Sequence, residues 1–183
     1  MVMDVVIRRG TERDAEALAE LAELTFPLAC PPYHTPQNIA MHLAEVLSEE
    51  DFEDYATDDD YDLFVAVGGG QLVGFALLDT LACDDEEVEP LLAGAHPSIE
   101  LSKLYVHPKA HGTGVAQQLF EACDESARDR SATSLWLTVW MENERALGFY
   151  RRNGFEVVGD RCYPVGELLD HDFVAVKVFS KGD

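Results

Sequence analysis

The chain has 183 residues and is strongly acidic, with 35 Asp and Glu against 13 Lys and Arg and a formal net charge of −22. This charge disfavours binding to nucleic acid or to an anionic membrane and attracts cationic substrates, although a solubility adaptation to salt explains it equally well. The apolar fraction of 47% is typical of a globular protein. No stretch approaches the roughly 18 unbroken apolar residues of a membrane span. We expect one domain over residues 1–183.

The sequence shows neither the pattern of a secretory signal nor that of a cysteine-based metal site. The N-terminal residues carry charges on both sides of a very short apolar run, whereas a secretory signal places basic residues before a longer one. The four cysteines are far apart and form no C-x-x-C pair, which argues against a zinc or redox site. We therefore expect a cytoplasmic protein without a metal.

The first part of the chain predicts two helices and a hairpin after an initial strand at residues 5–9. Thr11 begins a helix that is expected to end near Pro27. Thr35 and Pro36 form the N-cap and first turn of a second helix, which runs to about Leu47. Acidic residues dominate from residue 49 to 62. Strands at 63–67 and 71–78 then form a hairpin around the glycines 68–70.

The second part alternates strands with helices. An acidic loop at residues 84–89 precedes the predicted elements, which are strand 99–106, helix 114–130, strand 135–140, helix 143–152, strand 155–158 and strand 173–179. Asn153 and Gly154 end the second of these helices. This order predicts an α/β fold with a mixed central sheet of about six to seven strands and helices on both faces.

A glycine-rich turn joins the strand at 99–106 to the following helix. Gly112 and Gly114 bring backbone amides together at a helix N-terminus, which suits an anion, and a side chain on either glycine would obstruct a pyrophosphate. A Walker loop is excluded because Val115 and Ala116 follow Gly114, and the dinucleotide fingerprint is excluded by Gln117. Taken alone, the turn is equally compatible with no ligand.

Two spaced motifs change that interpretation. Residues 101–120, with Leu-Tyr-Val followed by His-Gly-Thr-Gly-Val-Ala, resemble the coenzyme A motif of the GNAT acetyltransferase superfamily. Residues 143–155 resemble the family block Asn-x-x-Ala-x-x-Phe-Tyr-x-x-x-Gly-Phe. The resemblance covers roughly residues 5–180 and is strongest over 99–156. The N-terminal half is more loosely similar to the spermidine/spermine-type bacterial branch.

The resemblance implies an acetyl-CoA-dependent N-acetyltransferase in which an amine attacks the thioester directly, without an acyl-enzyme. His111 stands where the family usually has Arg or Gln, so its contact with a phosphate would depend on pH. Backbone groups of Leu104 and Val106 would bind the pantetheine amides and polarise the acetyl carbonyl. Asn143 would hydrogen-bond the pantetheine arm, or serve as a plain helix N-cap. The implied cofactor-binding residues are Leu104, Tyr105, Val106, His111, Gly112, Thr113, Gly114, Val115, Ala116, Asn143, Phe149 and Arg152.

Acetyl transfer also needs a base and an acid, because an alkylamine with a pKa of about 10.4 is almost fully protonated at neutral pH. Glu100 is the candidate base, although it could instead face solvent or bind a second cation of the substrate. Tyr150 resembles the family's general acid for the coenzyme A thiolate, although it could instead pack in the core. Tyr33, His34 and Asp79 are the candidate acceptor-binding residues.

The predicted acceptor is the primary amine of a small, polyamine-like cation. One alternative is a protein or peptide acetyltransferase that acts on N-termini or lysines, and another is a non-catalytic acyl-CoA-binding protein. A homodimer also stays open, since dimers are common in the family.

Overall fold

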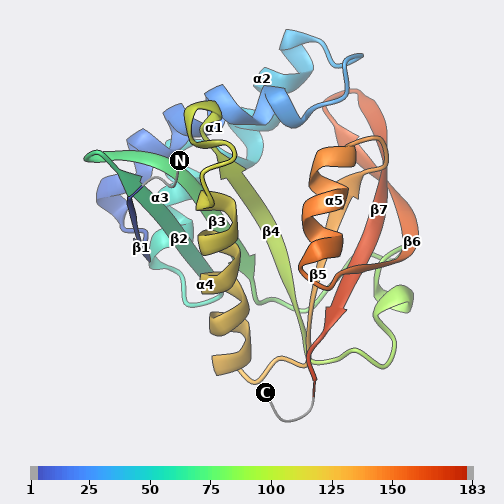
Figure 1. The fold of residues 1–183 in the computed structure, drawn as a ribbon. Coiled ribbons are helices and arrows are strands. Elements are labelled where there is room, and N and C mark those ends of the chain that lie inside the picture. Colours follow the sequence, from blue (N-terminus) through green and yellow to red (C-terminus); the bar gives the residue numbers. More distant parts are fainter. Residues whose placement is uncertain (1–3, 181–183) are drawn as a thin grey trace.

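The computed structural model describes residues 4–180, which form one seven-stranded sheet with helices on both faces (Figure 1). The strand order is β1-β2-β3-β4-β5-β7-β6. Only β4 and β5 are parallel, and every other neighbouring pair is antiparallel. This arrangement confirms the predicted α/β fold. The strands are β1 (Val5–Arg9), β2 (Tyr61–Gly68), β3 (Gln71–Asp79), β4 (Ser98–Val106), β5 (Ser134–Trp140), β6 (Glu156–Val165) and β7 (Leu168–Val178).

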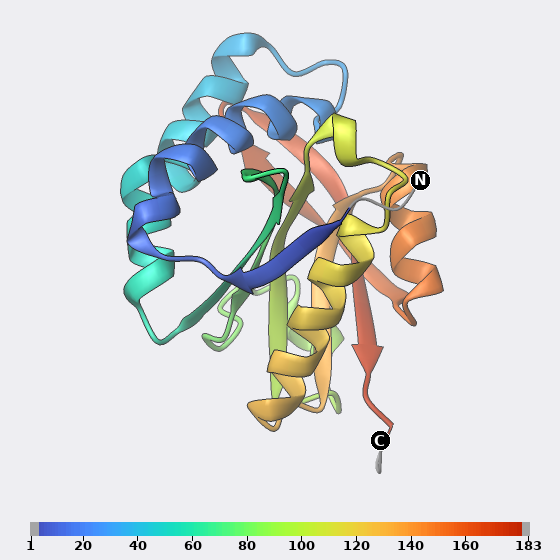
Figure 2. The ribbon, with the colours of Figure 1, turned by 60° about the vertical axis from the view of Figure 1, so that its left-hand side comes forward.

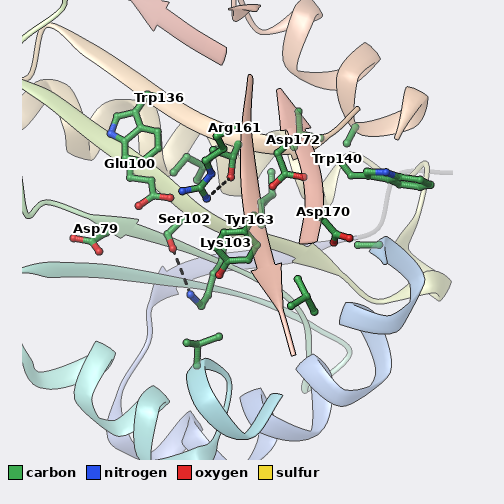
Figure 3. Close-up of a pocket in the computed structure, with 18 of the residues that line it drawn as sticks. Asp79, Glu100, Ser102, Lys103, Trp136, Trp140, Arg161, Tyr163, Asp170 and Asp172 are labelled. Carbon is green, nitrogen blue, oxygen red and sulfur yellow. Dashed lines mark hydrogen bonds between the residues drawn. The ribbon is translucent and has the colours of Figure 1, made fainter. Parts of the chain in front are cut away.

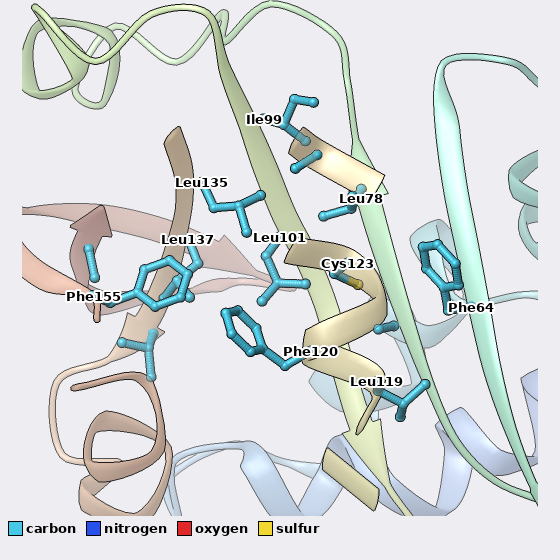
Figure 4. Close-up of a cluster of buried hydrophobic side chains, with 14 of the residues drawn as sticks. Phe64, Leu78, Ile99, Leu101, Leu119, Phe120, Cys123, Leu135, Leu137 and Phe155 are labelled. Atoms are coloured by element: carbon cyan, nitrogen blue, oxygen red, sulfur yellow. The ribbon is translucent and has the colours of Figure 1, made fainter. Parts of the chain in front are cut away.

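The helices cover the two faces of the sheet unequally (Figure 2). One face carries α1 (Ala15–Ala29), α2 (Pro36–Val46) and α3 (Glu49–Thr57), and the other carries α4 (Val115–Asp129) and α5 (Glu144–Arg152). Leu119, Phe120 and Cys123 of α4 pack on Leu101 and Leu135 of the sheet (Figure 4). No helix within residues 4–180 has the length and apolar character needed to cross a membrane.

The first helix and the acidic segment differ from their predictions. Helix α1 runs past Pro27 to Ala29. Pro27 removes only a bond to the carbonyl of Glu23, an exposed residue, while the buried Phe26 keeps the turn packed against the core. The acidic segment contains α3, which the sequence analysis missed. Ser48 and Asp51 form its capping box, and the fully buried Phe52 packs edge-on against Phe75.

The last two strands are much longer than the predicted 155–158 and 173–179. Strands β6 and β7 form one long hairpin that turns at Gly166, where φ is 58°. The prediction failed because residues 159–172 are rich in charged and turn-forming residues that resemble a loop. They pair with each other instead, and they carry four side chains of the site described below.

Strands β4 and β5 diverge soon after they begin (Figure 1). Their pairing is confined to Ser98–Glu100 and Ser134–Trp136. Beyond Glu100, the edge of β4 that faces β5 therefore has no strand partner. This opening lies beside the N-terminus of α4 and beside α5, and it is where both cavities of the candidate site lie.

Candidate active site

A first cavity of about 520 Å³ lies between β4, the N-terminus of α4 and α5. Every predicted cofactor-binding residue except Thr113 lines it. The Thr113 hydroxyl instead donates to the carbonyl of Ala110 at 2.6 Å, so this side chain stabilises the turn. Gln117 and Arg145 are among the lining residues that were not predicted from the sequence.

The turn before α4 has the geometry of an anion-binding site. Gly112 and Gly114 have φ values of 75° and 91°, which favour glycine, and a Cβ on either would meet no protein atom within 4 Å. The first helical bond of α4 runs from the amide of Gln118 to Gly114 at 3.1 Å. The amides of residues 115–117 therefore have no partner within the helix, and the helix dipole makes this end positive. These residues fit a pyrophosphate group.

His111 lines the cavity, but both of its ring nitrogens are engaged. Nε2 lies 2.9 Å from the carbonyl of Val106, and Nδ1 lies 2.9 Å from Nη1 of Arg145. A carbonyl can only accept and a guanidinium can only donate, so these two contacts fit a ring that carries its proton on Nε2. With both nitrogens engaged in this way, the expected phosphate contact by this ring stays a prediction. The cations at the cavity wall are Arg145 and Arg152.

A second cavity of about 590 Å³ lies on the face of the sheet that carries α1, α2 and α3 (Figure 3). Its wall includes residues of β3, β4, β5, β6 and β7 and the loop that follows β3. Six residues line both cavities, which places them where the two spaces meet: Ala29, Leu104, Tyr105, Asn143, Ala146 and Tyr150.

Tyr150 therefore lies between the two cavities and also packs in the core. Its ring contacts Phe149 and Phe155 edge-on, with centroid distances of 5.5 and 5.6 Å. Burial raises the pKa of Tyr150 above its ordinary value, so the hydroxyl is protonated at neutral pH and can donate. Asn143, about two turns earlier, caps α5 by accepting from the amide of Ala146 at 3.1 Å. Core packing of Tyr150 and capping by Asn143 are thus compatible with the position of both residues where the two cavities meet.

Glu100 faces the second cavity, a placement that the sequence could not settle. Its neighbour Leu101 points into the core under α4, and the carboxyl of Glu100 lies near Asp79 on the adjacent strand (Figure 3). Burial raises the pKa of Glu100 to about 7, the proximity of Lys103 lowers it, and Asp79 raises it further. A carboxyl with this pKa is partly ionised at neutral pH and can accept a proton.

A β-bulge places a lysine on the same wall. Leu77 pairs with Lys103 whereas Leu78 pairs with Leu101, so Ser102 is an extra residue in β4. Without the bulge, Lys103 would share the face of Leu101. With it, the Lys103 ammonium enters the second cavity, donates to the Ser102 hydroxyl at 3.3 Å and lies 5.1 Å from the Tyr55 ring centroid. Burial lowers the pKa of Lys103.

The β6–β7 hairpin supplies Arg161, Tyr163, Asp170 and Asp172 to the second cavity (Figure 3). Burial raises the pKa of Asp172 to about 6. The guanidinium of Arg161 forms an ion pair with Asp85 and lies 4.7 Å from the Tyr163 ring centroid. These four residues were not predicted, because the sequence pattern of the middle of the hairpin is typical of a loop.

Of the predicted acceptor-binding residues, only Asp79 lines the second cavity. Tyr33 and His34 do not line it but contact Asp170, which does. The Tyr33 hydroxyl donates to Asp170 at 2.8 Å, and Nε2 of the buried His34 lies 2.7 and 2.9 Å from the two carboxylate oxygens. These contacts position Asp170, and direct binding of the acceptor by Tyr33 and His34 stays a prediction.

The second cavity is acidic. Its wall holds the carboxyls of Asp79, Asp84, Asp85, Glu100, Asp170 and Asp172, against the cationic groups of Lys103 and Arg161. The imidazole of His42 adds no charge at neutral pH, because burial lowers its pKa to about 4. Within residues 4–180, no cluster of His, Cys, Asp and Glu has an arrangement that could hold a metal ion.

Comparison with known proteins identifies the family of this chain. The Acetyltransferase (GNAT) family matches residues 16–155, which include both cavity-forming motifs. The chain belongs to this family. It is therefore an N-acetyltransferase with acetyl-CoA as its acyl donor, as the two sequence motifs implied.

Several relatives of this GNAT acetyltransferase span its length. An uncharacterised N-acetyltransferase of Mycobacterium tuberculosis is 38% identical over 164 residues, covering 90% of this chain and 97% of that protein. An uncharacterised N-acetyltransferase of Lactobacillus delbrueckii is 27% identical over 94% of this chain and 96% of that protein. The PaiA N-acetyltransferase of Thermoplasma acidophilum, solved with coenzyme A, superposes with a TM-score of 0.77 at 20% identity, over 97% of this chain and 100% of that one. At that identity the similarity shows the fold alone.

Proposed function

We propose that this GNAT acetyltransferase moves the acetyl group of acetyl-CoA to a primary amine of a small cationic acceptor, by direct attack of the amine on the thioester. The observation that carries the proposal is the meeting of two cavities at Tyr150, one built for an anion and the other lined by carboxylates. Direct transfer requires both substrates to be bound together with their reacting groups at such a junction.

The first cavity would hold the donor. Amides at the start of α4, together with Arg145 and Arg152, suit the phosphates, and the partner-free edge of β4 suits the amides of the pantetheine arm. Leu104, Tyr105 and Asn143 line both cavities, so they would flank the thioester end of the donor. Acetyl-CoA supplies the acyl group and a thiolate leaving group.

Glu100 and Tyr150 would handle the protons. With a pKa of about 7, Glu100 can accept the proton that the acceptor ammonium must lose before its amine attacks the thioester. Tyr150, which burial keeps protonated, can donate a proton to the departing thiolate. The acidic wall around Glu100 would attract and hold a cationic acceptor, and Asp170 is fixed there by Tyr33 and His34.

Two measurements test the proposal. Titration calorimetry with acetyl-CoA should show saturable binding, and absence of binding at high micromolar cofactor would overturn it. A free-thiol assay with polyamines, aminoglycosides, amino acids and peptides should then show turnover with small cationic amines. Turnover with peptides alone would contradict the proposed acceptor class, and binding without turnover on any amine would indicate a non-catalytic protein.

A further inference from the structure

Lys103 is a half-buried cation that forms no ion pair among the described residues. Among the ion pairs of residues 4–180, none includes Lys103, and its ammonium donates only to the Ser102 hydroxyl at 3.3 Å. An ammonium can donate three hydrogen bonds, so this one has donors without a partner, although the charges of Glu100, Asp79 and Asp51 favour its protonated form. Burial outweighs these charges and lowers the pKa of Lys103. The β-bulge at Ser102 nevertheless directs this side chain into the second cavity.

Arg161, the other cation of this wall, is already engaged. Its Nη1 is paired with Asp85 and its Nη2 donates to the Thr138 hydroxyl at 3.1 Å. Its Nε has no hydrogen-bond partner among the described residues, but it is buried and has almost no accessible surface, so a ligand in the cavity does not reach it. Lys103, in contrast, has donors that are free to bind a ligand.

Glu100 lies close enough to both cations to feel their charge but neutralises neither. The proximity of Lys103 and of Arg161 lowers the pKa of Glu100, yet burial outweighs them and keeps that pKa at about 7. No ion pair joins Glu100 to either residue within the described chain. Figure 3 shows the Arg161 head group beside the Glu100 carboxyl, with Tyr163 between Arg161 and Lys103 in this view. A negative group from outside the chain would complete this arrangement.

We propose that the acceptor carries a carboxylate in addition to its amines, and that the Lys103 ammonium binds that carboxylate in the second cavity. This inference rests on the proposed amine acetylation and narrows its substrate class to amino acids with a side-chain amine. One amine reacts beside Glu100, and a second ammonium binds the remaining carboxylates of the wall, such as Asp170. Charge-assisted hydrogen bonds from the half-buried ammonium favour a carboxylate.

The same arrangement disfavours a simple polyamine. A diamine leaves Lys103 without an anionic partner and adds further positive charge to its surroundings. A site built to hydrogen-bond a substrate group rejects the analogue that lacks it, because the buried polar groups of the site are then left unsatisfied. The carboxylate therefore determines selectivity within the class of small cationic amines.

Matched acceptors test the inference on the unmodified enzyme. Lysine and cadaverine differ only in the carboxylate, as do ornithine and putrescine, and lysinamide removes the charge of the carboxylate alone. In the free-thiol assay, kcat/KM for each amino acid should exceed that for its diamine by about tenfold or more, and lysinamide should behave like cadaverine. Diamines that match or exceed the amino acids would overturn the inference and leave the proposed function intact. No turnover with any of the five would overturn both.

A charge-removing variant then assigns the effect to the subsite. Lys103→Met keeps an unbranched side chain one atom shorter without its charge, and Arg13→Met removes one positive charge from a residue that lines neither cavity. The ratio of kcat/KM for lysine to that for cadaverine should fall about tenfold in Lys103→Met and stay unchanged in Arg13→Met. Titration of lysine into the enzyme saturated with coenzyme A should show the same loss of affinity. An unchanged ratio in both variants would contradict the role of Lys103.

Discussion

The two cavities of this acetyltransferase are built in different ways. The first depends on backbone: two glycines with positive φ, unpaired amides at the start of α4 and a strand edge without a partner. The second depends on side chains contributed by β3, β4, β5, β6 and β7, several of them charged and buried. Ligand binding at a site built from backbone groups depends less on the identity of side chains, whereas a site built from side chains can change its ligand through single substitutions. Donor binding and acceptor choice should therefore respond separately to mutation.

The largest effect is expected at the junction of the cavities. Tyr150→Phe keeps the ring packed against Phe149 and Phe155 but removes the proposed proton donor. We expect kcat to fall by about 100-fold or more, with little change in the Kd of acetyl-CoA measured by calorimetry. An unchanged kcat would remove Tyr150 from the mechanism, and a parallel loss of cofactor binding would assign it to the donor cavity alone.

A smaller loss, and a change in pH dependence, is expected at Glu100. A base works only when unprotonated, so kcat/KM of the unmodified enzyme should rise with pH through about 7, the pKa of Glu100. In Glu100→Gln, kcat/KM at neutral pH should fall by roughly 10- to 100-fold and this rise should disappear. Glu125→Gln, a change at an exposed position on α4, is the control. Persistence of the rise in Glu100→Gln would assign it to another group.

The backbone-built cavity should respond to a single methyl group. Gly114→Ala places a Cβ at a residue with φ of 91°, which strains the turn that presents the amides. The Kd of acetyl-CoA should increase by about tenfold, while the ratio of kcat/KM between two acceptors stays constant. Gly94→Ala introduces a Cβ at a similar φ of 83° outside both cavities and should leave the Kd unchanged. Equal effects of both variants on the Kd would indicate general destabilisation.

A network of ion pairs and hydrogen bonds around Asp62 lies outside both cavities and should affect stability without affecting either substrate. Asp62 is 2% exposed and accepts from Arg9, Arg130 and Ser126, which together lower its pKa to about 2 against the effect of burial. Asp62→Asn should cost about 2 kcal/mol in urea unfolding and leave both substrate affinities unchanged. Since the folded pKa is lowered, this stabilisation is present above about pH 4 and is lost as pH falls toward 2. A change in acceptor KM would show that the network reaches the site.

The sequence predicted the first cavity better than the second for physical reasons. Contiguous residues build the turn at Gly112 and Gly114, so a short motif describes it. The inward placement of Glu100 could not be predicted, because side chains alternate between the two faces of a strand and the sequence does not say which face lines the cavity. The bulge at Ser102 also interrupts this alternation, so the face on which Lys103 lies could not be predicted either. Arg161 and Asp170 were missed because their hairpin was treated as loop. The capping box of Ser48 and Asp51 was readable, and it could have revealed α3.

The central claim is that donor and acceptor occupy two cavities at the same time and react where these meet. Initial rates measured while both acetyl-CoA and the acceptor are varied test it most directly. Direct transfer within a ternary complex predicts double-reciprocal lines that intersect. Parallel lines would show that acetyl first passes to the enzyme and that coenzyme A leaves before the acceptor binds, which would contradict the account.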